Sequence, residues 1–201
     1  QYYLIDAWAA YNLDARGIIN RNNPTTRLRA FIAGRIFKQE FQEIPKEFVN
    51  QNNYQYNSIS GILASFTLAK QVFYKTRFVY GFSRNEDIPE GFSAAIIGGY
   101  TNKQQRKRSY YGIDFQRSYF SKKKDYFNYS FKFGSYVHNK SVEDISYLLS
   151  VDYFSKLKKI SKRWTQRTFI SASFTRLDNI VLYDPLFISS NYGLPEFSNT
   201  P

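Results

Sequence analysis

Tyr126-Phe127-Asn128-Tyr129-Ser130-Phe131-Lys132-Phe133-Gly134 is a run in which, from Phe127 onward, aromatic side chains alternate with polar or small ones. After a short polar break a second run follows, in which the large apolar residues again share one parity: Ile145, Tyr147, Leu149, Val151 and Tyr153. Successive side chains of a β-strand point to opposite faces of the sheet. Each run therefore predicts a strand with one apolar and one polar face.

Such two-faced strands occur in two kinds of protein. In a soluble β-sandwich the apolar face is turned inward and the polar face is in water. In an outer-membrane barrel the apolar face contacts lipid and the polar face lines a wet interior. Strand length separates the two, because globular strands usually have ~5–6 residues and a tilted membrane-spanning strand needs ~9–11.

The alternation recurs along the chain and predicts about nine strands, most of them with about 10–13 residues. They are expected at residues 1–14, 26–38, 54–69, 72–82, 92–101, 111–116, 127–134, 145–153 and 167–174. Lys70-Gln71 is expected to form a tight turn, and residues 84–91, which include Pro89, a connection. Strands of this length favour the membrane, so we expect an all-β fold: an antiparallel transmembrane β-barrel, of which these strands are a part.

Composition agrees with this expectation and excludes other classes. Aromatic residues make up 19% of the chain, and aromatic residues are frequent in strands and in the girdles of membrane barrels. There is no cysteine, which excludes disulfides and thiolate chemistry. No apolar run approaches the ~18 residues of a membrane-spanning helix. Small residues at 94–99 (Ala94, Ala95, Gly98 and Gly99) predict a bend or a close approach of two backbones.

The net charge is +12, and the basic residues cluster at predicted strand breaks: Gln104–Arg108, Lys122–Lys124 and Lys156–Lys159. This pattern argues against nucleic acid as a partner. Solvated loops explain most of it, and phosphates of outer-membrane lipid or lipopolysaccharide are the next candidate. The chain has no methionine and begins directly on strand-like sequence. Residues 1–201 are therefore expected to be a portion of one outer-membrane barrel domain, with an N-terminal periplasmic region and further strands outside it.

The predicted polar and apolar faces give two candidate surfaces. A lumen-facing basic set consists of Arg27, Arg29, Arg35, Lys75, Arg77, Lys132 and Arg167. An acidic set on the same face consists of Asp6, Asp114 and Asp152. The lipid-facing aromatic residues are Phe127, Tyr129, Phe131, Phe133, Tyr147 and Tyr153. A ladder of ion pairs that stiffens the wall is the simplest role for the charges, and a channel or docking surface for anionic or polypeptide cargo is the alternative.

Catalytic and metal sites have little support in the sequence. The single histidine, His138, follows Ser135 by three residues, as in a barrel lipase with a Ser–His pair, but such spacing is common by chance. Glu86-Asp87 and Glu143-Asp144 could bind calcium weakly, although solvated acidic loops are the default. We expect no catalytic residue, metal or cofactor, and no enzymatic activity.

Two segments carry a resemblance to a known family. Phe73–Phe82 together with Asn85–Gly91 resembles a segment of surface-antigen barrels in Bacteroidetes-type bacteria, which belong to the BamA-like and two-partner-secretion superfamily. Tyr192–Phe197 looks like a variant of that superfamily's conserved loop, but Pro195-Glu196 replaces the Arg-Gly pair, so the role of that arginine is not carried over. The resemblance covers about residues 54–201.

The resemblance implies assembly, insertion or translocation of proteins at the bacterial outer membrane, with other envelope proteins or unfolded outer-membrane proteins as partners. Three alternatives remain open from the residues: a porin or substrate-selective channel, a soluble all-β binding module, and a barrel lipase that depends on His138.

Overall fold

The computed structural model describes residues 2–13, 28–42, 56–79 and 84–182. Its strands are β1 Tyr2–Leu13, β2 Leu28–Phe41, β3 Ile59–Arg77, β4 Asn85–Lys103, β5 Arg106–Phe120, β6 Tyr126–His138, β7 Ser141–Phe154, β8 Lys158–Lys159, β9 Thr165–Gln166 and β10 Phe169–Asp178. Eight of them form one antiparallel sheet in the order β1-β2-β3-β4-β5-β6-β7-β10, and β8 and β9 form a separate hairpin. The predicted all-β antiparallel fold is confirmed.

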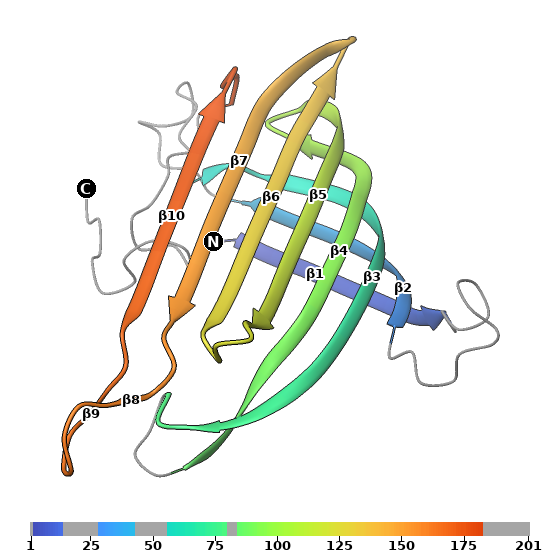
Figure 1. The fold of residues 1–201 in the computed structure, drawn as a ribbon. Helices are drawn as coiled ribbons and strands as arrows, with labels where there is room; N and C mark the ends of the chain where they lie inside the picture. The colour runs from blue at the N-terminus through green and yellow to red at the C-terminus, as the bar shows by residue number, and fades with distance from the viewer. Residues whose placement is uncertain (1, 14–27, 43–55, 80–83, 183–201) are drawn as a thin grey trace.

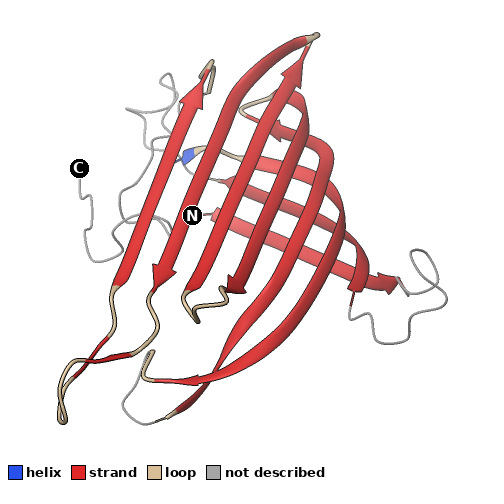
Figure 2. Cartoon of the chain, in the orientation of Figure 1, coloured by secondary structure: helices blue, strands red, loops and turns tan. Residues whose placement is uncertain are grey.

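The sheet is long and strongly curled but not closed. Figure 1 shows β5, β6, β7 and β10 side by side, while β1 and β2 run behind them at a steep angle. β1 and β10 are the two edges of the sheet, and in the described part of the chain no strand pairs with the outer side of either. Figure 2 shows that strands make up nearly all of the fold, with a single 3₁₀ turn at Tyr56. No helix among the described residues has the length and apolar character to cross a membrane.

Pairing between strands keeps the side-chain alternation in step across the sheet. One continuous row of directly paired residues runs from β2 to β7: Ile32, Phe66, Ile96, Ile113, Phe133 and Tyr147. Directly paired residues of neighbouring strands point to the same face. Because the register holds over so many strands, the apolar parity of each strand lies on one common face and the polar parity on the other.

The strand count differs from the predicted one at two places: the short β8–β9 hairpin was not predicted, and one predicted turn is absent. Lys70 pairs with Phe92 and Gln71 with Gly91, so the ladder continues where a tight turn was predicted. The two strands predicted at 54–69 and 72–82 are thus one strand, β3. Residues 84–91 are likewise not a connection, because β4 begins at Asn85. Pro89 is tolerated there because β5 pairs with β4 only as far as Gly91, which leaves Pro89 on an edge.

Gly91 allows this long hairpin to bend. Its φ is +152°, and a Cβ atom added there would lie 1.8 Å from the carbonyl oxygen of Lys70. Only glycine accepts such a backbone without strain. Beyond the bend, Ile88 packs with Tyr126 and Phe154 in the one small buried apolar cluster of the described residues. The Tyr126 hydroxyl also donates to the carbonyl oxygen of Pro89 at 3.2 Å. The bent end of the β3–β4 hairpin is therefore tied to β6 and β7.

Replacing Gly91 by alanine tests the bend. Gly91→Ala gives residue 91 a strained φ and brings its Cβ atom against the backbone oxygen of Lys70. We therefore expect it to lower the free energy of unfolding by about 1–3 kcal/mol. Gly34→Ala is the matched control, since a Cβ there meets nothing within 4 Å. Equilibrium unfolding in urea, followed by far-ultraviolet circular dichroism, gives both values. Equal stability of the two variants would contradict the bend.

Candidate functional site

The most extensive chemical feature of the fold is one apolar face on which, among the described residues, only Ala30 is fully buried. We call it the apolar band. Three of its isoleucines are more than half exposed in the middle of the sheet: Ile36 at 57%, Ile62 at 60% and Ile96 at 61%. By register the band consists of Ile5, Ala7, Ala9, Tyr11, Leu13, Ala30, Ile32, Gly34, Ile36, Ile62, Ala64, Phe66, Leu68, Phe92, Ala94, Ile96, Gly98, Tyr100, Tyr111, Ile113, Phe115, Phe127, Tyr129, Phe131, Phe133, Tyr147, Leu149, Val151, Tyr153, Ile170, Ala172 and Phe174.

The band has sharp limits along the central strands. On β5, Lys107 and Arg117 share its face and lie ten positions apart, with no charged residue of the same parity between them. On β3 the run of Ile62, Ala64, Phe66 and Leu68 ends at Lys70. Ten residues of a strand span about 34 Å, and a strand tilted by about 40° projects this length onto about 25 Å. The band therefore has the height of the apolar belt on membrane barrels, about 25 Å.

The band shifts along its length instead of following one row. On β10 the apolar residues of this face are Ile170, Ala172 and Phe174, and the next residue of that parity is Arg176. Arg176 pairs across the ladder with Tyr147 and forms an ion pair of 2.9 Å with Asp178. The apolar run of β10 is thus displaced toward the end of the sheet where Tyr153 lies. On β1, at the other edge, the apolar run is displaced toward the opposite end, where Ile5 pairs with Lys38. Such a shift from strand to strand is expected when strands cross an apolar belt at a tilt, because each strand then meets the belt at a different position along its length.

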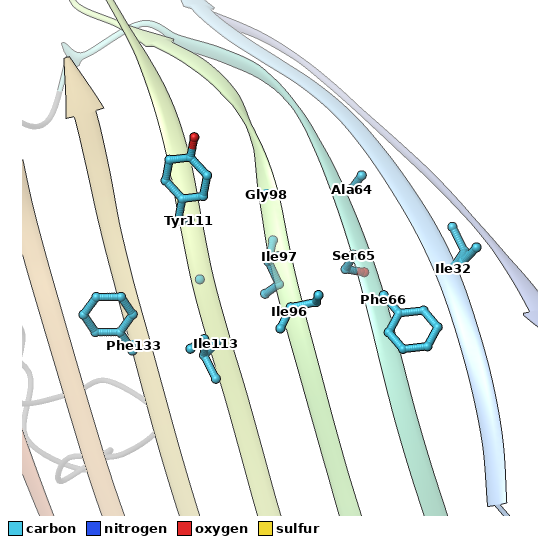
Figure 3. A pocket seen from close by; sticks show the side chains of 11 residues that line it. Ile32, Ala64, Ser65, Phe66, Ile96, Ile97, Gly98, Tyr111, Ile113 and Phe133 are labelled. Atoms are coloured by element: carbon cyan, nitrogen blue, oxygen red, sulfur yellow. The ribbon is translucent and has the colours of Figure 1, made fainter. Parts of the chain in front are cut away.

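A hollow of about 690 Å³ lies in the middle of the apolar band. Figure 3 shows the rings of Phe66 and Phe133 at its two sides, with Ile96 and Ile113 between them. The hollow forms because Ala64 and Gly98, neighbours in one row, are too small to fill the surface. At Gly98 the missing side chain leaves room for the hollow. At Gly99, in contrast, a Cβ atom would lie 2.2 Å from the backbone oxygen of Ile62. The predicted close backbone approach therefore holds at Gly99.

All six aromatic residues that were predicted to face lipid lie on the apolar band, and each is half-buried by its neighbours. The rings contact one another across β6 and β7. The ring centroids of Phe127 and Tyr153 are 5.1 Å apart, and those of Phe133 and Tyr147 are 5.4 Å apart. The structure therefore brings this set together as one aromatic surface.

The opposite face carries the charges of the strands, and four of the predicted ones form two ion pairs. Arg35 donates to Asp6 through Nε at 2.9 Å and Nη2 at 2.6 Å. The Lys132 ammonium lies 3.2 Å from an Asp114 carboxylate oxygen. Asp152 accepts hydrogen bonds from Asn128 at 3.0 Å and Ser171 at 2.5 Å. These contacts form a polar ladder in two parts, one on β1–β2 and one from β5 to β10.

The other predicted basic residues do not join that ladder. Arg29 is exposed, and Lys75 and Arg77 lie on the bent end of β3 beyond Gly91. Arg167 lies between β9 and β10 and donates to the carbonyl oxygen of Phe78 at 3.2 Å. Partial burial lowers the pKa of the Arg167 guanidinium, while the charge of Glu86 opposes that change. Arg27 lies outside the described residues.

A cluster of four charges, two of them buried, was not predicted. Arg106 pairs with Glu143, and Arg108 lies between Glu143, at 3.6 Å, and Asp144. The Arg108 and Glu143 side chains are only 2% and 4% exposed. A β-bulge in β7 opposite Gly134–Tyr136 places two successive carboxylates on the arginines. The sequence does place Arg106, Arg108 and Tyr110 on the same parity as Asp114, which could have indicated that the two arginines belong to a strand. These arginines were instead predicted to lie at a strand break.

Asp144 also holds the segment that follows β10. Its Oδ1 accepts the backbone N–H groups of Val181 at 2.6 Å and Leu182 at 3.1 Å. The backbone N–H of Asp144 in turn donates to the carbonyl oxygen of Asn179 at 2.8 Å. A small cavity of about 220 Å³ lies between this segment and Ile59 at the start of β3. Glu143 and Asp144 are thus engaged by arginines and backbone amides instead of forming a calcium loop.

The suspected Ser–His pair is not assembled. Ser135 and His138 lie three positions apart on β6 and therefore on opposite faces. The His138 Nδ1 lies 2.8 Å from the carbonyl oxygen of Lys107. Within the described ranges, no group of three or more acidic, histidine or cysteine side chains is placed to hold a metal ion. No protein-family model, no curated protein and no solved structure matches this chain.

Glu143→Gln tests the buried cluster. The change leaves Arg108 buried with only one carboxylate partner, and loss of one member of a buried ion pair costs about 3 kcal/mol or more of unfolding free energy. Asp6→Asn breaks a pair with Arg35 that is exposed, so we expect a loss of about 0–1 kcal/mol there. Urea unfolding of the two variants measures the difference. A Glu143→Gln variant as stable as Asp6→Asn would show that the cluster contributes little.

Proposed function

We propose that this chain forms part of the wall of a transmembrane β-barrel in a bacterial outer membrane, without enzymatic activity, and that the barrel acts in assembly, insertion or translocation of proteins there. The observation that carries the membrane assignment is the apolar band. It is exposed, it crosses all eight strands of the main sheet, and between Lys107 and Arg117 it has the height of a lipid belt.

The energetics of the sheet support this proposal. The buried apolar cluster of the described residues consists of Ile88, Tyr126 and Phe154, which is small for so large a sheet. In water, an apolar face of this extent needs a second layer of structure, because contiguous exposed apolar patches rarely exceed a few hundred Å². Lipid covers such a face without a second layer. The proposal therefore accounts for a sheet that has almost no core of its own.

The charges on the polar face support a water-filled interior with a structural role more than an anion-selective channel. Arg35 and Lys132 are neutralised by Asp6 and Asp114, so they present little net charge to a passing solute. Such pairs are typical of a wall held in one shape. A porin that selects anions would leave more of its inward arginines unpaired.

The open edges supply the argument for handling other proteins. A strand edge in hydrocarbon needs a pairing partner, since each unsatisfied backbone group there costs several kcal/mol. β1 and β10 each present such an edge in the described structure. Such an edge is completed either by further strands of the same barrel or, when it opens, by an incoming strand, as in other cases of β-augmentation. This agrees with the function that the resemblance to BamA-like barrels implies.

The membrane assignment is tested with single cysteines, because the chain has none of its own. Ile96 and Ala95 are neighbours on β4 with side chains on opposite faces. In outer-membrane vesicles, we expect Ile96→Cys to resist a charged, water-soluble maleimide and Ala95→Cys to react with it. The proposal also predicts that the protein sediments with membranes without detergent and migrates differently on a gel before and after boiling.

Each other outcome has a defined meaning for this proposal. Soluble protein with no heat-dependent shift would overturn the membrane assignment and leave the apolar band as the interface of a soluble module. Protection of both cysteines in a membrane fraction would overturn the wet interior. Reaction of both cysteines in folded protein would exclude lipid at Ile96.

The role in protein assembly is tested at an edge. A photoreactive amino acid at Ala172 on β10 should crosslink to an added, urea-unfolded outer-membrane porin, because a pairing strand would lie beside it. The same amino acid at Ala64 in the middle of the sheet is the control, since strands already flank it on both sides. Crosslinks at Ala64 alone, or at neither position while the barrel is folded, would contradict the assembly role.

A further inference from the structure

The β8–β9 hairpin projects beyond the end of the main sheet (Figure 1). Lys158 pairs with Gln166 and Lys159 with Thr165, and the backbone N–H of Ile160 donates to the carbonyl oxygen of Trp164 at 3.0 Å. Ile160 and Trp164 are 66% and 72% exposed at the tip. Continuing the ladder outward places these two apolar side chains opposite each other. The hairpin thus carries an exposed apolar tip.

The hairpin and its neighbour are strongly basic. Residues 155–168 contain Lys156, Lys158, Lys159, Lys162, Arg163 and Arg167 and no acidic residue. The β5–β6 turn carries Lys122, Lys123 and Lys124 and lies beside the hairpin, because the backbone N–H of Lys156 donates to Asp125 at 2.9 Å. No salt bridge to a described residue involves any of these lysines or Arg163. Two loops therefore combine into one exposed cationic surface, which we call the basic rim.

The basic rim adjoins the end of the apolar band. The last residues of the band on this side, Phe127 and Tyr153, lie next to Tyr119 and are aromatic. Aromatic residues at the end of an apolar belt mark the level of lipid head groups, and cations just beyond it meet their phosphates. An exposed tryptophan and isoleucine between lysines are suited to the same interface.

We propose that the basic rim binds the phosphate groups of lipopolysaccharide in the outer leaflet, with Trp164 and Ile160 inserted at the head-group level. The inference rests on the proposed membrane wall. Loop length supports the choice of leaflet: the two-residue turns Gln104–Gln105 and Asn139–Lys140 lie at the opposite end of the sheet, and short turns are the periplasmic ones. The β2–β3 connection, residues 42–58, is the one long connection at that end.

Trp164 provides its own reporter. The chain has two tryptophans, so in a Trp8→Phe background all tryptophan emission comes from Trp164. The full chain is reconstituted in phosphatidylcholine vesicles that contain lipopolysaccharide, dephosphorylated lipopolysaccharide, phosphatidylglycerol or no addition. We expect Trp164 emission to shift to shorter wavelength only with phosphorylated lipopolysaccharide. The shift should disappear near 1 M salt, where the screening length falls to about 3 Å.

A charge-matched pair of variants locates the effect. Lys162→Gln with Arg163→Gln removes two charges from the hairpin tip and should weaken the response to lipopolysaccharide about 30-fold, since each basic residue at an anionic surface contributes about 1 kcal/mol. Lys107→Gln with Lys140→Gln removes two exposed charges at the opposite end and should leave the response unchanged.

The outcomes separate this inference from the proposed function. Loss of heat-dependent gel migration in the parent protein would overturn the membrane wall itself. A protein that shows heat-dependent gel migration but no shift of Trp164 emission with lipopolysaccharide would overturn only the lipopolysaccharide site. An equal response to dephosphorylated lipopolysaccharide or to phosphatidylglycerol, or equal weakening by both pairs of variants, would also overturn it.

Discussion

The strict period of two along each strand, held in register by the backbone ladder, is the constraint on which the whole structure depends. A slip of one residue between two strands would exchange their faces and place Lys132 beside Ile113. The row from Ile32 to Tyr147 shows that no such slip occurs along the middle of the sheet from β2 to β7, and between these strands the register shifts only at the β7 bulge opposite Gly134–Tyr136. Both the apolar band and the ladder of ion pairs are consequences of this register, because neither surface exists within a single strand.

The parity of the side chains could be predicted from the sequence, and the breaks between strands could not. Alternation placed the Phe127 series on one face and Asp6, Asp114 and Asp152 on the other without any knowledge of pairing partners. It failed at Lys70-Gln71, where polar residues continue a strand because Phe92 and Gly91 pair with them. A polar dipeptide in a two-faced strand carries the same local signal as a turn, and only the neighbouring strand distinguishes them.

The buried charge cluster shows a different limit of sequence reasoning. Arg108 is buried because a bulge in β7 doubles the carboxylates opposite it, and a bulge adds one residue without changing local composition. Glu143-Asp144 therefore looked like a solvated loop. The same bulge gives Asp144 a positive φ of 46° and directs its carboxylate to the segment after β10. The cluster thus joins β5, β7 and that segment, which are separated in the sequence.

The distribution of charge along the strands connects register to environment. If water covered both faces, nothing would keep lysines and arginines out of the middle of one face, yet on β5 that face has no charge between Lys107 and Arg117. The charges that the strands carry in the middle of the sheet lie on the other face and are paired, as Lys132 is with Asp114. Beyond the end of the band, the two loops of the basic rim carry eight exposed lysine and arginine side chains for which the described residues offer no salt-bridge partner: Lys122, Lys123, Lys124, Lys156, Lys158, Lys159, Lys162 and Arg163. This order along one axis, from apolar band to aromatic rings to cations, is the order that the proposed membrane wall requires.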